Sequence, residues 1–466
     1  MLFSSITFLY YFLPAVLAVY FVVPSRLKNA VLLVASLLFY TWGEPRFSII
    51  MVTTALAGYL AGQAINHLKR NSLRKLALAA GVIICLIPLF LFKYGDFAIN
   101  NLNQLFPAAL TPLKLALPIG VSFYTFQILS YVVDVYRENL KAERNPFYFL
   151  MYVAFFPQLI AGPIVRFQTI SSEIRDRKVT AELFASGITR FICGLGKKIL
   201  IANTLAEFAR NLSAGGTPSV LSLWMGSLAF TLQIYFDFSG YSDMAIGLGS
   251  MFGFHFLENF DYPYLSRSVT DFWRRWHMSL GSWFRDYVYI PLGGSRGSAA
   301  KTYRNLLIVW LLTGLWHGAS WNFVLWGLFY FCLLALERAG LGKLLKRLPV
   351  ALAVLYTFLL VHLGFVMFNA DSLGQAVMNL KGMFGLRELP LAEPLALYYT
   401  KSYLPTMLMA LVAATPLPRH ALKSLTKWKA APVSDWIAVA GLALVLVFST
   451  ASLIDGSFNP FLYFRF

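Results

Sequence analysis

The sequence reads DFWRRWHMSL over residues 271–280, WFRDY over residues 283–287 and LWHGA over residues 315–319. These stretches are rich in arginine, aspartate, histidine and tryptophan, whereas the chain around them is mostly apolar. Ionisable side chains held in or beside a bilayer are costly, and by default they mark a functional site. We therefore expect the chemistry of this protein to lie within residues 271–317.

The composition is that of a membrane protein. Of the 466 residues, 58% are hydrophobic and 13% are charged, against about 45–50% and about 25% in soluble domains. The formal net charge is +18, but the basic residues lie in short clusters between apolar runs, as cytoplasmic loops do. Membrane lipid is the expected environment, and no nucleic-acid partner is expected. Cys85, Cys193 and Cys332 are far apart, which argues against a disulfide framework or metal knuckle and favours buried apolar side chains.

Apolar runs indicate many helices in the membrane. A spanning helix needs about 20 apolar residues, so we expect about 10 to 12 membrane elements, several of them too short to cross alone. Breaks at Pro157, Gly162 and Pro163 predict a broken or re-entrant element, because such breaks need protein or water around the backbone. The expected elements are Ile6–Val23, Ala30–Trp42, Phe47–Asn66, Leu76–Phe92, Leu115–Tyr136, Phe147–Val165, Ser219–Phe236, Tyr303–Trp316, Trp321–Leu336, Pro349–Phe368, Tyr403–Leu417 and Asp435–Leu453.

Basic clusters predict the orientation of these elements. Cytoplasmic loops carry an excess of lysine and arginine, and the charge-poor connections Asn100–Thr111 and Ser372–Lys401 are then expected on the outer side. The first apolar run lacks the charged start of a signal peptide, so we interpret it as a retained helix. The basic clusters are Lys69–Lys75, Arg137–Arg144, Arg166–Lys178, Arg338–Arg347 and Arg419–Lys429.

His317 has two interpretations from its position alone. It ends a short apolar run and is followed by Gly318-Ala319-Ser320. A neutral imidazole at a helix end beside small residues can face a cavity and accept a proton from a substrate hydroxyl. Alternatively, the histidine only caps a helix C-terminus against the helix dipole. The two interpretations have equal weight at this point.

His277 lies in a dense polar and aromatic context. Trp273 and its neighbours could form an interfacial belt, with Arg274 and Arg275 reaching toward lipid headgroups. However, acidic residues and Arg285 follow within the same stretch, and a belt does not need them. We therefore keep His277 as a candidate functional residue.

Other polar residues point to structure more than to chemistry. Asp237 and Asp243 flank Ser239-Gly240-Tyr241, which we interpret as a turn with helix-capping aspartates. No two histidines have the spacing of a zinc site, so no metal is expected. A catalytic triad is poorly supported as well.

Five motifs together resemble the membrane-bound O-acyltransferase family. They are LPIGVSFY (117–124), LIAGPI (159–164), YFDFSGYSDMA (235–245), FWRRWH (272–277) and LWHGA (315–319). Within the family, the chain is similar to the bacterial branch that acetylates polysaccharides. The branch that transfers D-alanine to teichoic acid shares the tryptophan–histidine core, but residues 239–245 are closer to the acetylating branch.

The resemblance implies a fold and a set of site residues. It predicts one membrane-embedded domain over residues 1–466, with helices around a central funnel or tunnel. The catalytic core would cover about residues 115–370, between N-terminal helices 1–114 and C-terminal helices 371–466. His317 would be the catalytic histidine and His277 a second tunnel-facing residue. Further substrate or tunnel candidates are Trp273, Arg274, Arg275, Trp316, Asp237 and Arg285.

The resemblance also implies a multi-pass acetyltransferase of the bacterial inner membrane. The acetyl group would come from acetyl-CoA on the cytoplasmic side, with no permanently bound cofactor. It would reach a polysaccharide hydroxyl, alginate-like as a first expectation, directly or through a periplasmic acetyltransferase partner. His317 would act as general base, and His277 or a neighbour would orient a reactant or stabilise the oxyanion.

Other functions stay open at this point. The acceptor could be cellulose or peptidoglycan, or the reaction could be D-alanyl transfer to teichoic acid. A transporter or flippase would line a substrate path with the same buried polar residues and broken helices. A scaffold for polysaccharide synthesis would tolerate loss of both histidines.

Overall fold

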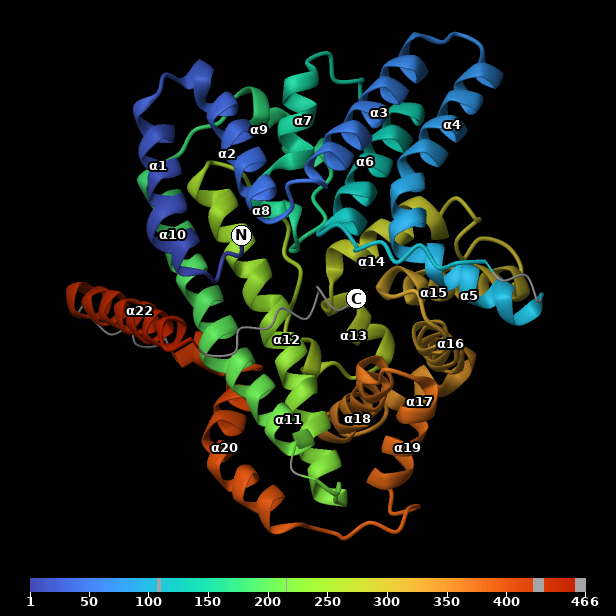
Figure 1. Cartoon of the computed structure of the whole chain (residues 1–466), viewed down its shortest axis with the longest axis vertical. Coiled ribbons are helices and arrows are strands. Elements are labelled where there is room, and N and C mark those ends of the chain that lie inside the picture. Colours follow the sequence, from blue (N-terminus) through green and yellow to red (C-terminus); the bar gives the residue numbers. More distant parts are fainter. Residues whose placement is uncertain (107–109, 215, 422–430, 457–466) are drawn as a thin grey trace. The chain divides into compact units, whose positions relative to one another are not determined.

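The computed structural model describes residues 1–106, 110–214, 216–421 and 431–456, and within them every regular element is a helix (Figure 1). Within these described ranges, five helical stretches are long and apolar enough to cross a membrane. The predicted all-α, polytopic membrane architecture is therefore confirmed. The five stretches are Ser48–His67, Asn71–Leu105, Trp321–Leu345, Val350–Asn369 and Trp436–Ile454.

The chain folds into two compact units. The first consists of Met1–Ile188 and Met244–Leu257, and the second of Thr189–Asp243 and Glu258–Phe466. The expectation of a single domain over residues 1–466, with a funnel or tunnel at its centre, stays a prediction.

Close helix packing through glycine characterises the first unit. Helix α3 packs against α4 and α6. A Cβ atom on Gly58 would lie 2.2 Å from Ile128 of α6, and one on Gly62 would lie 2.6 Å from Tyr131. Small residues let membrane helices approach in this way. The helices of the unit are α1 (Leu13–Val22), α2 (Lys28–Gly43), α3 (Ser48–His67), α4 (Asn71–Leu89), α5 (Gly95–Leu105), α6 (Val121–Tyr136), α7 (Pro146–Ala154), α8 (Phe156–Leu159) and α9 (Phe167–Arg175).

Two predicted elements of this unit contain breaks. The segment Phe147–Val165 is broken as predicted, because α7 ends at Ala154 and only the single turn α8 follows. The re-entry of this segment into the membrane stays a prediction. Helix α6 begins at Val121 and not at Leu115 as predicted. The reason is Gly120, whose φ of 76° is left-handed and whose Cβ position lies 2.5 Å from a backbone oxygen.

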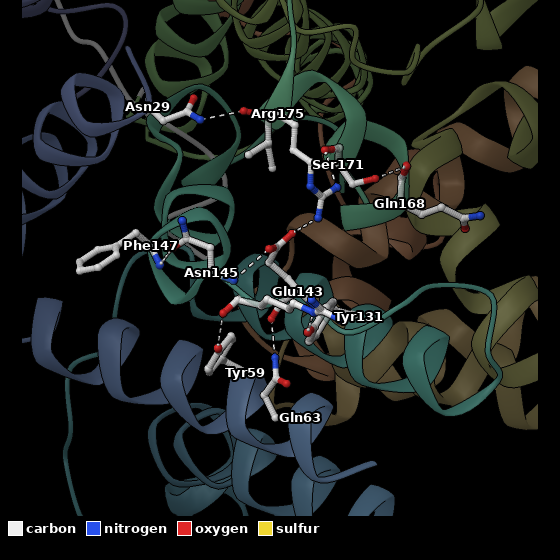
Figure 2. Close-up of polar contacts among 12 residues, drawn as sticks. Asn29, Tyr59, Gln63, Tyr131, Glu143, Asn145, Phe147, Gln168, Ser171 and Arg175 are labelled. Carbon is white, nitrogen blue, oxygen red and sulfur yellow. Dashed lines mark hydrogen bonds and ion pairs between the residues drawn. The ribbon is translucent and has the colours of Figure 1, made fainter. Parts of the chain in front are cut away.

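A buried carboxylate organises the basic loop between α6 and α7 (Figure 2). Glu143 forms an ion pair with Arg175 of α9 and accepts a hydrogen bond from the backbone N–H of Asn145 at 2.9 Å. Its backbone N–H donates to the Tyr131 hydroxyl at 3.0 Å, and its carbonyl accepts from Gln63 of α3. The loop is thus tied to three helices.

The second unit contains long and short helices. Helix α10 (Ala181–Gly196) and helix α12 (Val220–Met251) contribute residues to both units. The helices that lie wholly in the second unit are α11 (Thr204–Ala214), α13 (Val269–Arg275), α14 (Met278–Phe284), α15 (Ala299–His317), α16 (Trp321–Leu336), α17 (Gly342–Leu345), α18 (Val350–Asn369), α19 (Leu373–Met383), α20 (Pro394–Ala413) and α22 (Ala431–Ile454).

Several of these helices were not expected from the sequence. Helices α10 and α11 contain charged residues, which lower the hydropathy that reveals a membrane helix. Ser372–Lys401 was expected to be a connection, whereas α19 and the start of α20 lie there. Asn100–Thr111 was also expected to be a connection, but α5 continues to Leu105.

Helix α12 overturns the interpretation of Asp237 and Asp243 as helix caps. The helix is continuous from Val220 to Met251, so both aspartates lie within it. Asp237 pairs with Lys198 at 2.7 Å, and Asp243 pairs with Lys197 at 2.7 Å. Neither aspartate caps a helix end: Asp237 compensates the charge of the buried Lys198, and Asp243 that of the half-buried Lys197.

Two smaller expectations have mixed outcomes. Cys85 is buried as expected, but Cys193 and Cys332 are exposed at the protein surface. A thiol there can face lipid, so an apolar character does not require burial in protein. Of the last basic cluster, Lys423, Lys427 and Lys429 lie outside the described residues, as do residues 107–109 of the predicted outer connection.

Candidate active site

A cavity of about 560 Å³ lies in the second unit and is lined by both His277 and His317. The cavity therefore brings together the two histidines that the sequence analysis singled out. Three of the other candidates also line it, namely Trp273, Arg274 and Arg285. Its remaining walls are mostly apolar or aromatic side chains. A cavity of this size is in the range that holds small-molecule ligands, about 300–1,000 Å³.

His277 lies at the junction of α13 and α14. Its φ is +44°, a left-handed conformation that costs a residue with a side chain about 1–2 kcal/mol. The flanking backbone is fixed by hydrogen bonds from Met278 N–H to the Asn259 carbonyl and from Asp261 N–H to the Arg275 carbonyl, each 3.0 Å. Backbone strain of this kind concentrates at functional sites.

The start of α13 is held from two sides. Ser268 caps the helix by accepting the N–H of Asp271 at 3.0 Å. The carboxylate of Glu337, directly after α16, accepts the N–H groups of Val269 and Thr270 at 2.6 and 2.9 Å. These N–H groups have no partner inside the helix, and a carboxylate there is also favoured by the helix dipole. The segment that carries His277 is thereby anchored to the end of α16.

His317 is the last residue of α15, as the sequence predicted, and Gly318 after it is extended. Helix α15 packs tightly on α16 through two glycines. A Cβ on Gly314 would lie 2.2 Å from the Phe323 carbonyl oxygen, and one on Gly327 would lie 2.3 Å from the Trp310 carbonyl oxygen. The helices therefore touch backbone to backbone, which fixes the end of α15.

Aromatic rings surround the two imidazoles. The His317 ring lies 5.0 Å from Trp326, and the Trp316 ring lies 5.0 Å from His317 and 5.8 Å from His277. Trp273 packs 4.8 Å from Tyr330 and belongs to the same aromatic cluster. Trp276 lies in the same buried cluster at 4% exposure, and Trp273 is partly buried against it, so the two side chains pack into the protein and do not form an interfacial belt. Trp326 and Tyr330 were not identified from the sequence, because they lie in an apolar, aromatic-rich helix that has the pattern of an ordinary membrane span.

Burial determines the protonation of His277. Its side chain is 2% exposed, and the pKa of its imidazole is lowered well below 6.5, mainly by desolvation and secondarily by the charge of nearby His317. His277 therefore stays neutral at neutral pH. A neutral imidazole in a cavity can accept a proton or a hydrogen bond.

The remaining candidates differ in their relation to the cavity. Arg274 and Arg285 are exposed as well as lining the cavity, which places them at its mouth, and Arg285 also pairs with Asp286 at 2.8 Å. Arg275 does not line it, and pairs with Asp271 at 3.0 Å. Trp316 is buried beside both histidines without lining the cavity.

Asp237 is not part of the cavity lining. It forms an ion pair with Lys198 in which the two side chains are only 2% and 1% exposed, and Lys198 also donates to Asn203 at 2.9 Å. The geometry gives Asp237 a structural role.

Replacing Asp237 with alanine is therefore expected to destabilise the fold. The change leaves the Lys198 ammonium buried without its carboxylate, and breaking a buried ion pair costs about 3–5 kcal/mol. A thermal-unfolding scan of the detergent-solubilised protein should show a clearly lower Tm. The double variant Asp237→Leu/Lys198→Met should recover most of the loss, since apolar pairs replace buried ion pairs well. A folded but inactive Asp237→Ala protein would instead give Asp237 a part in the chemistry.

Comparison with known proteins identifies the class. The family model of the membrane-bound O-acyltransferases matches residues 76–341, and the chain belongs to this family. It is accordingly a multi-pass membrane protein and an acyltransferase.

Individual relatives indicate the branch of the family. Over the full length of both chains, the sequence is 42% identical to the probable alginate O-acetylase AlgI of Pseudomonas putida. It is 32% identical to the peptidoglycan O-acetyltransferase of Helicobacter pylori, over 100% of this chain and 98% of the relative. The teichoic acid D-alanyltransferase of Bacillus subtilis is 29% identical over 67% of this chain and 81% of the relative. The similarity to the acetylating relatives is thus higher and covers more of the chain.

Proposed function

We propose that this protein transfers acetyl groups from acetyl-CoA, across the bacterial inner membrane, for O-acetylation of an exopolysaccharide of the alginate type. The observation that carries the proposal is the single cavity lined by His277 and His317 in a chain 42% identical, over its full length, to a probable alginate O-acetylase. The 32% identity to a peptidoglycan O-acetyltransferase supports a glycan acceptor in general.

In the proposed reaction, the acceptor hydroxyl attacks the carbonyl carbon of the acetyl thioester. His317 takes the hydroxyl proton as the new C–O bond forms, and the C–S bond then breaks to release CoA. The imidazolium returns the proton to the departing thiolate, so protons and charges balance. General base catalysis of this kind contributes about 10²–10⁴-fold.

The oxyanion formed in this step needs hydrogen-bond donors in a dry environment. Trp273 lines the cavity, and its indole N–H is buried without a hydrogen-bond partner among the described residues. An indole nitrogen can only donate. Trp273 is therefore the proposed donor to the thioester oxygen.

The two arginines at the cavity mouth suit the phosphates of CoA. Guanidinium groups bind phosphate oxygens through paired, charge-assisted hydrogen bonds. Within the described part of the chain, Arg274 has no ion pair that would compete for its guanidinium. We assign Arg274 and Arg285 to the donor side of the cavity.

Replacing Arg274 with glutamine is expected to raise the KM for acetyl-CoA about tenfold, with kcat nearly unchanged. The estimate corresponds to the loss of one hydrogen bond to a charged group, about 1.5–3 kcal/mol, reduced by exposure. Initial rates at varied acetyl-CoA measure the effect. Arg275→Gln is the matched control, because the neighbouring Arg275 pairs with Asp271 and does not line the cavity. An unchanged KM in both Arg274→Gln and Arg285→Gln would remove the phosphate assignment.

The size of the cavity bears on the acceptor. A volume of about 560 Å³ holds the reactive ends of two substrates but not a folded polymer. The immediate acceptor is therefore a single presented hydroxyl, either on the polysaccharide chain or on a periplasmic acetyltransferase partner that passes the acetyl group on.

The orientation of the chain follows from its basic loops. These loops, among them the loop in which Glu143 forms its hydrogen bonds, are assigned to the cytoplasmic side by their positive charge.

Reconstitution in liposomes tests this function against transport. Purified protein is supplied with CoA carrying a labelled acetyl group on one side and with an alginate oligosaccharide, with or without the periplasmic partner, on the other. Acetyl transfer requires CoA release together with label on the acceptor. Movement of a cargo without thioester cleavage would favour a transporter, and transfer from a D-alanyl donor alone would favour the teichoic-acid reaction.

A further inference from the structure

We propose that Asn259 is a positioning residue that holds His277 in the tautomer protonated on Nδ1, so that the bare Nε2 faces the cavity as a hydrogen-bond acceptor. The inference rests on the proposed acetyl transfer for its catalytic meaning. The tautomer itself is a property of the protein alone and can be measured without any turnover.

The orientation of the Asn259 amide is fixed by its neighbours. Its Oδ1 lies 3.2 Å from the backbone N–H of Ser279 and 2.8 Å from the Ser279 hydroxyl. A backbone N–H can only donate, so the atom facing it must be the oxygen. The amide nitrogen of Asn259 donates in the opposite direction, to the Ser242 hydroxyl at 3.1 Å. All of these groups are buried, which makes a reversed amide costly.

The same oxygen determines where the His277 proton lies. The Nδ1 atom of His277 is 3.1 Å from Asn259 Oδ1, and an amide oxygen accepts hydrogen bonds but cannot donate them. The Ser279 hydroxyl also lies 3.4 Å from Nδ1, but it donates to the nearer Asn259 Oδ1 at 2.8 Å. Nδ1 therefore carries the hydrogen. A neutral imidazole has only one N–H, so Nε2 carries a lone pair.

The lone pair of His277 has no use within the described part of the protein. Nε2 is buried and has no hydrogen-bond partner among the residues that the structure describes, and His277 lines the cavity. Buried polar atoms are nearly always paired, so an unpaired one in a cavity points to a ligand. The ligand group must be a hydrogen-bond donor, such as a hydroxyl of the acceptor or an amide N–H of the pantetheine arm of CoA.

The surroundings keep His277 from becoming charged. The titratable group facing it from α15 is His317, while α12 presents the uncharged ring of Phe238 at 4.6 Å. Arg274 and Arg285 add positive charge along the same cavity wall. Burial, and after it the charge of His317, disfavours the imidazolium and lowers the pKa of His277.

This arrangement narrows the role of His277. The sequence left two roles open for His277, orienting a reactant or stabilising the oxyanion. A neutral His277 with a bare Nε2 can orient a reactant. It does not fit stabilisation of the oxyanion, which requires a donor. The two histidines therefore have different tasks, with His277 holding a substrate N–H or O–H while His317 takes the proton.

The first test is nuclear magnetic resonance of the wild-type protein labelled with ¹⁵N-histidine. The sequence has six histidines, and the signal lost in His277→Ala identifies His277. At neutral pH we expect its Nδ1 to be protonated and its Nε2 unprotonated. A proton on Nε2, or an imidazolium, overturns the proposal whether or not acetyl transfer is observed.

The second test is the pH profile of Asn259→Asp. A carboxylate at this position stabilises the imidazolium and raises the pKa of His277, so Nε2 becomes protonated as the pH falls. Toward pH 6 the variant should lose at least tenfold more activity than the wild type loses over the same range, and it should recover toward pH 8. A uniform loss at every pH would indicate a structural role only and overturn the proposal.

Matched variants separate positioning from folding. Asn259→Ala removes the hydrogen-bond acceptor without adding charge, and should lower kcat about 10–100-fold, as loss of a residue that orients a functional histidine does elsewhere. Asn305→Asp is the control, because Asn305 is equally buried but donates to the carbonyls of Leu292 and Gly294 and does not line the cavity. The control should not change the pH profile. The KM for acetyl-CoA and the KM for the oligosaccharide are then measured in Asn259→Ala. The substrate whose KM rises is the one that His277 holds.

Discussion

Replacing His317 with alanine is expected to abolish acetyl transfer while leaving a folded, membrane-inserted protein. His317 ends α15 and lines the cavity, and it is the proposed base for the acceptor hydroxyl. Loss of a general base lowers the rate about 10²–10⁴-fold, which is large enough to bring labelled transfer in liposomes near background.

Two controls make this result interpretable. His255→Ala removes a histidine that pairs with Glu173 at 2.7 Å in the first unit, and it should retain wild-type transfer. Gel filtration and the Tm of His317→Ala should remain close to those of the wild type, since the change removes one ring from an otherwise intact aromatic cluster. Transfer by His317→Ala at the wild-type rate would exclude His317 as the base and would favour the scaffold or transporter function.

Replacing Gly314 with alanine is expected to cause a comparable loss without touching a chemical group. The new Cβ would lie 2.2 Å from the Phe323 carbonyl oxygen, and a backbone oxygen cannot move aside as a flexible side chain can. Overpacking costs about 1–3 kcal/mol, and a displacement of about 1 Å at a catalytic group can lower the rate about 10²-fold. Both Tm and kcat should therefore fall.

Gly441→Ala is the matched control for Gly314→Ala. Gly441 lies in α22, where nothing is within 4 Å of the Cβ position, so the substitution should leave both Tm and kcat unchanged. Normal activity of Gly314→Ala would mean that α15 and α16 separate without moving His317.

The sequence predicted which histidines line the candidate site, but it did not predict the residue that positions His277. FWRRWH and LWHGA stand out because they place ionisable groups in an apolar chain, and both histidines line the cavity. Asn259 could not be found in the same way. Its role depends on a folded backbone that brings residue 259 beside residue 277, and no periodicity or charge pattern marks it.

The errors in the fold have a common physical cause. Hydropathy detects helices that face lipid, and it recovered α3, α4, α16 and α18. It fails for helices whose charges are neutralised by partners, such as α10, where Arg190 pairs with Asp243 of α12 at 2.9 Å. The same compensation made Asp237 look like a turn residue, because an aspartate inside a buried helix is expected only when its counter-charge is known.

The attachment of Glu337 to the start of α13 has a mechanical consequence. The end of α16 is hydrogen-bonded through Glu337 to the segment that carries His277. Along its length, α16 packs closely against α15, which carries His317. Any displacement of α16 would therefore move both segments together, which preserves the spacing of the two imidazoles.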